Sequence, residues 1–332
     1  MPRTLTIPVL TAALGLAAAG APAHGQTQHL LVGDYAGDRI VRFGWPDGRV
    51  IDHFVAAGLS PLANTRTMVL GPDGLLYVAS QITDSVLRYD AGTGEYLGEF
   101  VAPGFGGLEG PIGIVFTPDG DLLVSSRAND RVLRFEGGTG AAMGAFVAPR
   151  SGGLDVPHKG LVFAANGSLL VSSFQNDSVL RYDGQTGAFL EVAVESGELG
   201  LDQPTDLALL PDGRVLVCSY ASDAILEIDP EGEVSVFVAA STTPLDQPQD
   251  IELAPDGTVF VSYNGRDGGV LRFAQDGAYL GVFLTGTAGG IDGFPASLLF
   301  VPEPCEADFD GDGSLTIFDF LAFQNAFDAG CP

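Results

Sequence analysis

The sequence predicts an all-β protein, and three observations support this prediction. First, a Pro-Asp-Gly or Ala-Asn-Gly turn recurs, with its central residue at Asp73, Asp119, Asn166, Asp212 and Asp256, at intervals of 46, 47, 46 and 44 residues. Second, each copy is followed by two short apolar runs, such as LLVSS and then RVLRF. Third, these runs show no helical periodicity, and 46 glycines lie along the chain. Short strands separated by tight turns account for this pattern.

Each repeat reads as four strands. An inner strand such as GIVF (113–116) precedes the turn, a second strand follows it, the VLRY-like run is the third, and the fourth ends near FVAP. Asn-Asp and Thr-Gly turns separate them. Four strands in each repeat of about 40–50 residues, with recurring glycine and aromatic positions, are typical of a β-propeller blade.

Six blades are predicted over residues 28–302. The first copy, marked by RIVRF (39–43), lacks an inner strand, whereas PASLLFVPEP (295–304) resembles an inner strand with nothing after it. The last strand is therefore expected to complete the first blade, which would close the ring and remove free sheet edges.

The chain is strongly acidic, with a formal net charge of −27 and Lys159 as its only lysine. This charge disfavours nucleic acid and anionic membranes as partners.

The N-terminus has the features of a secretory signal peptide. Arg3 precedes the apolar stretch LTIPVLTAALGLAAA (5–19), and APA (21–23) offers a cleavage site. We expect residues 1–23 to be removed, with cleavage after Gly25 or an uncleaved anchor as alternatives. The stretch is short for a membrane span, so the mature chain is expected to lack one and to be secreted, extracellular or at the cell surface.

Two series of acidic residues recur once per blade. The rim acids precede the inner strands: Glu109, Asp155, Asp202, Asp246 and Asp292. We interpret them as residues that bond their own loop backbone, with a cation-attracting ring as the alternative. The hairpin acids precede the third strands: Asp38, Asp84, Asp130, Asp177 and Asp223. We interpret these as turn residues.

The PDGxLxV and NDRVLRF-like segments of residues 28–302 resemble NHL-repeat propellers and, more distantly, gluconolactonases and streptogramin lyases. The lactonase resemblance implies a divalent metal held by Glu, Asn or Asp at the starts of inner strands. The matching positions are Arg66, Ile112, Lys159, Thr205, Gln249 and Ala296. None is Asn, Asp or Glu, although Asp206 and Asp250 lie one position further on and could bind a metal.

A candidate site on the propeller face therefore comprises Arg66, His158, Lys159, Asp206, Gln249 and Asp250. The lyase resemblance implies a catalytic His and Glu, but we interpret His158 as polar surface. Cys218, within the apolar run VLVCSY, is interpreted as a buried thiol. We favour a non-catalytic binding or scaffold protein whose propeller face engages a protein or a glycan. The alternative is a metal-dependent lactonase or other hydrolase, or a lyase.

The C-terminal segment predicts a calcium site. Counted from Asp308, the side chains of positions 1, 3, 5 and 12 are carboxylates, position 6 is Gly313, and an apolar pattern with helical spacing follows at 318–327. This is the spacing of an EF-hand-like loop. The predicted Ca²⁺ ligands are Asp308, Asp310, Asp312, Ser314, Thr316 and Asp319.

Residues 305–332 resemble a single dockerin repeat, because position 12 is Asp and no helix precedes the loop. A Cys305–Cys331 disulfide is predicted to close this tail. The resemblance implies a cohesin-like partner. Since only one repeat is present, a sorting signal or cell-surface attachment is the alternative.

Overall fold

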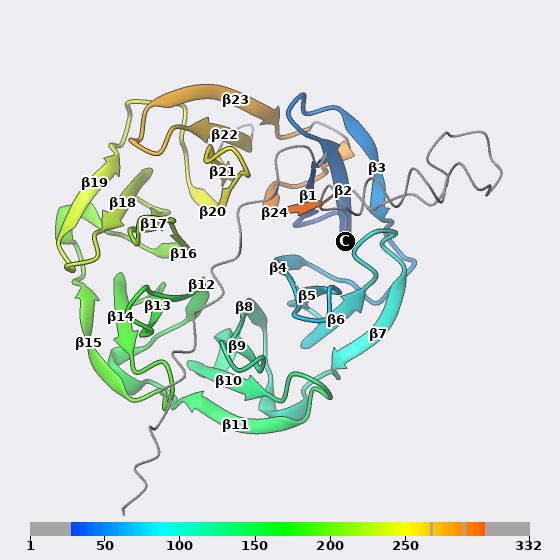
Figure 1. The fold of residues 1–332 in the computed structure, drawn as a ribbon, viewed down its shortest axis with the longest axis horizontal. Coiled ribbons are helices and arrows are strands. Elements are labelled where there is room, and N and C mark those ends of the chain that lie inside the picture. The colour runs from blue at the N-terminus through cyan, green and yellow to red at the C-terminus, as the bar shows by residue number, and fades with distance from the viewer. Residues whose placement is uncertain (1–27, 266–267, 288–289, 303–332) are drawn as a thin grey trace, which may run out of the picture. The chain divides into compact units, whose positions relative to one another are not determined.

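The computed structural model describes residues 28–265, 268–287 and 290–302, and within them it shows an all-β, six-bladed propeller. Six four-stranded sheets surround one axis, so the predicted fold class is confirmed (Figure 1). The predicted signal peptide, calcium loop and Cys305–Cys331 disulfide lie outside the described residues. Among the described residues, no helix has the length and apolar character needed to cross a membrane.

The blades are numbered from the N-terminus, and their strands are given from the axis outward. Blade 1 contains β24 (Pro295–Pro302), β1 (Gln28–Asp34), β2 (Arg39–Gly44) and β3 (Val50–Val55); blade 2 contains β4 (Thr65–Leu70), β5 (Leu76–Ser80), β6 (Ser85–Tyr89) and β7 (Tyr96–Val101). Blade 3 contains β8 (Pro111–Phe116), β9 (Leu122–Ser126), β10 (Arg131–Phe135) and β11 (Ala142–Val147); blade 4 contains β12 (Pro157–Phe163), β13 (Leu169–Ser173), β14 (Ser178–Tyr182) and β15 (Phe189–Val194). Blade 5 contains β16 (Pro204–Leu209), β17 (Val215–Ser219), β18 (Ala224–Ile228) and β19 (Val234–Val238); blade 6 contains β20 (Pro248–Leu253), β21 (Val259–Tyr263), β22 (Gly269–Phe273) and β23 (Tyr279–Thr285).

The ring closes as the sequence predicts. Strand β24 pairs antiparallel with β1, with Leu30 opposite Phe300, so the last strand completes the first blade. β24 therefore covers the axial edge of β1, which would otherwise be a free sheet edge.

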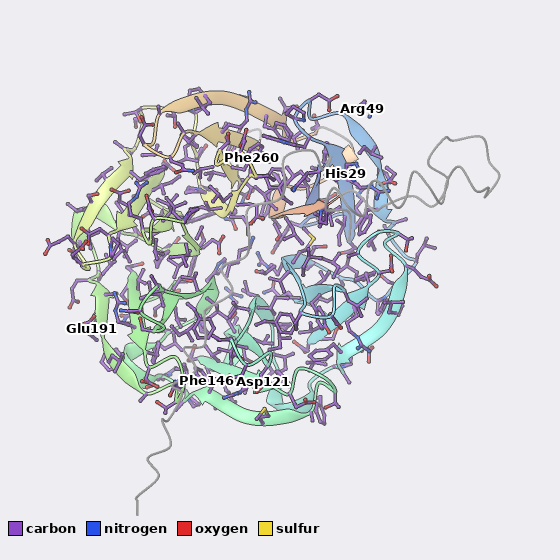
Figure 2. The ribbon with its side chains drawn as sticks, in the orientation of Figure 1. His29, Arg49, Asp121, Phe146, Glu191 and Phe260 are labelled. Carbon is purple, nitrogen blue, oxygen red and sulfur yellow. The ribbon has the colours of Figure 1, made fainter. Side chains whose placement is uncertain are left out.

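The core lies between neighbouring sheets. The second strands are almost continuously apolar, and all five residues of β5, β9, β13, β17 and β21 are buried, because a neighbouring blade covers each of their faces. At the closure, Phe260 packs edge-on against Trp45, Phe283 and Phe300. Figure 2 shows Phe260 within the ring, whereas Arg49 and Glu191 lie at its outer edge.

The hairpin acids form turns, as predicted, and they also tie neighbouring blades together. All five have positive φ, between 49° and 56°. In addition, Oδ1 of each accepts the backbone N–H of a residue before the next inner strand. These bonds are Asp38–Asn64 (2.7 Å), Asp84–Gly110 (2.7 Å), Asp130–Val156 (3.0 Å), Asp177–Gln203 (3.0 Å) and Asp223–Gln247 (2.9 Å). Each acid thus satisfies a backbone donor one blade away.

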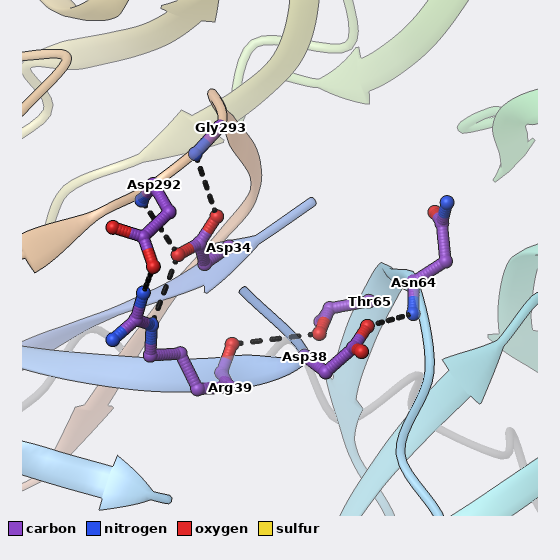
Figure 3. Close-up of polar contacts among 7 residues, drawn as sticks. All are labelled: Asp34, Asp38, Arg39, Asn64, Thr65, Asp292 and Gly293. Atoms are coloured by element: carbon purple, nitrogen blue, oxygen red, sulfur yellow. Dashed lines mark hydrogen bonds and ion pairs between the residues drawn. The ribbon is translucent and has the colours of Figure 1, made fainter. Parts of the chain in front are cut away.

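Asp34 plays a related role at the closure (Figure 3). Its carboxylate accepts hydrogen bonds from the backbone N–H groups of Asp292 (2.9 Å) and Gly293 (3.2 Å), which lie just before β24. It also pairs with Arg39 Nε at 3.0 Å, and Arg39 in turn pairs with the Asp292 carboxylate. Asp34 is fully buried, so this network fixes the loop that delivers the closing strand.

Candidate ligand-binding site at the axial face

Equivalent positions in the six blades meet at the end of the axis where the inner strands begin. In blades 3 to 6 and in β24, the first inner-strand residue is a proline that pairs with the end of the second strand; Thr65 takes this place in blade 2. The next residue of each inner strand belongs to the upper tier: Arg66, Ile112, His158, Thr205, Gln249 and Ala296. The residue after that belongs to the lower tier: Thr67, Gly113, Lys159, Asp206, Asp250 and Ser297.

Blade 4 has one extra residue in this part of its inner strand: β12 contains seven residues, whereas β16 and β20 contain six. Counted from Pro157, which pairs with Ser173, His158 is the equivalent of Thr205, and Lys159 that of Asp206. Counted from Leu161, which pairs with Val171 as Leu207 does with Val217, Lys159 is the equivalent of Thr205, as the sequence predicts. The tiers are counted from the first inner-strand residue.

A buried ion pair spans the lower tier. Lys159 Nζ lies 2.8 Å from Asp250 Oδ1, and the two residues are 2% and 4% exposed. The other oxygen of Asp250 accepts the N–H of Leu298 in blade 1 at 2.7 Å. The interpretation of His158 as polar surface is wrong, because His158 and the adjacent Lys159 are both buried.

Acidic side chains next to this pair bond the neighbouring inner strand. Asp206 accepts the N–H of Ile251 at 2.9 Å, and Glu252 accepts the N–H of Phe300 at 3.2 Å. Burial, followed by repulsion from Asp250, raises the pKa of Asp206 to about 8, although Lys159 opposes the shift. Burial also raises the pKa of Glu252 to about 8. Each of these two carboxyls thus accepts a hydrogen bond from a backbone N–H of the neighbouring inner strand.

The lower tier already contains its own cation. The Lys159 ammonium lies against Asp250 and lowers the pKa of Asp206, which is the effect a metal ion would have there. Among the residues that the structure describes, no three His, Cys, Asp or Glu side chains are grouped so as to hold a metal. Asp206 and Asp250 are therefore arranged as partners of Lys159 and of backbone donors.

Cys218 is a free thiol and is fully buried, as predicted. Burial raises its pKa well above the usual value, and Asp206 and Asp250 raise it further. A thiol held protonated in this way is a poor nucleophile.

A second set of residues, the mouth ring, surrounds the upper tier. It consists of the residue that follows the second strand of each blade: Tyr35, Gln81, Arg127, Phe174, Tyr220 and Asn264. Arg127 is exposed, and the other five are half-buried. These residues were not among the site residues predicted from the sequence. Their common signal is the position directly after each second strand, which ends in serine in blades 2 to 5.

Together the upper tier and the mouth ring form the axial face, which has a cationic part and an aromatic part. The Arg66 guanidinium lies 4.5 Å from the ring centroid of Tyr35, and its Nε donates to Gln81 Oε1 at 2.7 Å. His158 stacks on Phe174 with ring centroids 5.0 Å apart, and Phe174 lies 6.1 Å from Tyr220. Such a surface offers both ring stacking and charge.

A pocket of about 390 Å³ lies beside this face between blades 2 and 3. Its lining includes Gln81 and Arg127 of the mouth ring together with Asp84, Glu109 and Gly110. Asp84 Oδ1 already accepts the Gly110 N–H, and the Glu109 carboxylate accepts from the Asn129 amide. Arg127 is therefore the charged group left to meet a ligand there.

Among the described residues, at least two of the rim acids do not bond their own loop backbone, contrary to the prediction from the sequence. The Glu109 carboxylate accepts from the Asn129 side-chain amide at 3.4 Å, and the Asp292 carboxylate pairs with Arg39. These two carboxylates thus bond side chains rather than their own loop backbone. Order in the rim loops comes instead from backbone groups, which bond second-strand serines: the N–H groups of Glu109, Asp155 and Asp202 donate to Ser126, Ser173 and Ser219, each at 2.9 Å.

No family model and no curated protein sequence matches the chain. Its fold is similar to many solved structures. A virginiamycin B lyase from Staphylococcus aureus is 16% identical with a TM-score of 0.56, covering 76% of this chain and 82% of that one. A chain of a nidogen/laminin complex is 14% identical with a TM-score of 0.66, covering 82% and 98%. A putative 6-phosphogluconolactonase from Bacteroides uniformis is 22% identical with a TM-score of 0.53, covering 75% and 79%. At these identities the similarity establishes the six-bladed propeller fold.

Proposed function

We propose that this protein is a secreted β-propeller that binds a glycan ligand at its axial face and is held in place through a calcium-binding, dockerin-like tail. The observation that supports the binding role is the arrangement of His158, Phe174 and Tyr220 beside Arg66 on that face. Partly exposed aromatic rings next to charged groups are typical of ligand-binding surfaces.

The lower tier favours binding over metal-dependent hydrolysis. Its carboxylates are engaged by Lys159 and by the backbone of Ile251 and Leu298. The alternative, a lactonase or lyase, would be supported by turnover in a panel of lactones and esters with added divalent metals. Turnover that Asp206→Ala abolishes would replace the binding proposal.

The axial face can be tested with oligosaccharides. We expect at least one class in a panel of xylo-, manno-, cello- and galacturono-oligosaccharides to raise the melting temperature of the mature protein, since a ligand that binds the folded state stabilises it. The Phe174→Ala/Tyr220→Ala variant should lose this shift, because stacking on both rings is removed. Tyr279→Ala is the matched control, since Tyr279 is a 40% exposed aromatic on the outer strand β23. A shift that survives in the double variant would place binding elsewhere, and the absence of any shift would contradict the proposal for the propeller.

The tail is tested by calcium titration. The mature protein is expected to bind one Ca²⁺ per chain, and the Asp308→Ala/Asp312→Ala variant is expected to lose this binding, because two of the carboxylate ligands are removed. Isothermal titration calorimetry measures both. The control Asp119→Ala/Asp276→Ala removes the same charge from two exposed turn residues. An equal heat signal in all three proteins would contradict the calcium site.

A further inference from the structure

The axial face contains cations that lack carboxylate partners, in a protein with a net charge of −27. Seven arginines among the described residues pair with acids, as Arg134 does with Asp121 at 2.6 Å and Arg214 with Glu227 at 2.7 Å. Within the described ranges, neither Arg66 nor Arg127 has a carboxylate at salt-bridge distance. In the same ranges Arg88, Arg131 and Arg272 also lack such a partner, but they lie on third strands, whereas Arg66 and Arg127 lie together at the axial face.

Arg66 is the more informative of the two because it is buried. It is 7% exposed, and the only acceptor that it contacts among the described residues is Gln81, through Nε. The donors on its two terminal nitrogens are therefore free for an external acceptor. Burial lowers the pKa of Arg66 to about 10, with Arg127 contributing to the shift against an opposing effect of Tyr35. Keeping a guanidinium buried without a carboxylate is costly, and a bidentate anion would offset that cost.

His158 extends the same surface toward the aromatic rings. It is 6% exposed, and its Nδ1 has no hydrogen-bond partner. Burial lowers its pKa well below the usual value, and the positive charges of Arg66, Lys159 and Arg127 lower it further. At neutral pH its ring is therefore uncharged and stacks on Phe174 as a flat aromatic surface. Arg66, Arg127 and His158 come from three consecutive blades, so the cationic and aromatic parts adjoin.

We propose that the axial face binds a ligand in which a carboxylate is joined to a six-membered ring. The carboxylate would lie on Arg66 and Arg127, and the ring would lie against Phe174 and Tyr220. Two kinds of molecule share this chemistry: a uronic acid residue of an acidic glycan and an aromatic carboxylic acid. This proposal rests on the proposed binding function and specifies its ligand.

The test measures binding of four probes to the mature chain by calorimetry. These are trigalacturonate, its methyl ester, 4-hydroxybenzoate and its methyl ester. We expect at least one acid to bind and its neutral ester to bind at least tenfold more weakly, since the ester cannot accept the charge-assisted bonds. Binding of trigalacturonate alone identifies a sugar acid as the ligand. Binding of 4-hydroxybenzoate alone identifies an aromatic acid, which would replace the glycan of the proposed function while keeping the binding face.

Variants assign the binding to the proposed residues. Arg66→Gln is expected to weaken binding of the acid about 10–100-fold, and Arg66→Lys less, because lysine keeps the charge but loses the bidentate geometry. Arg49→Gln, which changes an arginine with a 75% exposed side chain on the outer edge, should leave affinity unchanged. Thermal melting of each variant confirms that it is folded.

Three outcomes would overturn the inference: no binding of either acid, equal binding of acid and ester, or unchanged affinity in both Arg66 variants. If acid and ester bind equally and Phe174→Ala/Tyr220→Ala abolishes the binding of both, the axial face is still the binding site, but it has no preference for a carboxylate. If no probe and no oligosaccharide of the wider panel binds, the proposed function falls as well.

Discussion

Replacing Lys159 with methionine is expected to destabilise the folded protein by about 3–5 kcal/mol at pH 7, because it leaves the buried Asp250 carboxylate without its counter-charge. Methionine has a similar length and fills the same space, so little of the loss should come from a cavity. Asp206 would also lose the positive charge that lowers its pKa. The unfolding midpoint in urea measures the effect.

A second substitution separates the charge effect from packing. In Lys159→Met/Asp250→Asn the carboxylate is replaced by a neutral amide whose oxygen can still accept the Leu298 N–H. The double variant should therefore recover most of the stability that Lys159→Met loses. A single variant within 1 kcal/mol of the wild type, or a double variant no more stable than the single one, would show that the pair does not hold the lower tier together.

The blades could be predicted from the sequence because their information is local. The Pro-Asp-Gly turns fix where strands begin and end, and the apolar runs fix which strands are buried. The closure was also predictable, because the first repeat lacks an inner strand and the chain has one inner strand too many at its end. Pairing the last strand with the first repeat accounts for both. The pairing of β24 with β1 confirms that inference.

The axial face was predicted only in part because its register is irregular. In blades 2 to 6 the pairing between the inner and second strands shifts just after the first residue, as between Pro157 and Leu161. In blade 4 this shift includes one residue more than in blade 5, so Lys159 aligns with Asp206 when counted from Pro157 and with Thr205 when counted from Leu161. The burial of Lys159 could not be inferred either, because a lysine is usually exposed unless a partner is known, and Asp250 lies 91 residues away.

The inter-blade hydrogen bonds of the hairpin acids have a recognisable spacing in the sequence. The acceptor and donor residues are 26 positions apart in four of the five inter-blade bonds and 24 apart in the fifth. An Asp at a fixed distance before each inner strand therefore indicates a tie between blades as well as a turn. Residue type alone shows only the turn.

Replacing Glu252 with glutamine is expected to stabilise the protein at pH 8 and to have little effect near pH 4. Its pKa is raised to about 8 in the folded state, chiefly by burial. Near pH 4 the carboxyl is largely protonated in both states and does not discriminate between them. As pH rises from about 4.5 to 8, the unfolded chain releases the proton while the folded protein retains it, so the wild type loses stability across this range.

Glutamine removes that loss and keeps the acceptor for the Phe300 N–H. The full shift would correspond to nearly 5 kcal/mol, but Glu252 keeps part of its surface exposed, so we expect a gain of about 2 kcal/mol at pH 8. Urea unfolding at several pH values measures the difference between the variant and the wild type. Glu231→Gln, at an exposed turn, is the control and should show no pH-dependent difference. A gain of equal size at pH 4 and pH 8 would point to packing, and a loss at both would show that the carboxylate itself stabilises the contact between blades 6 and 1.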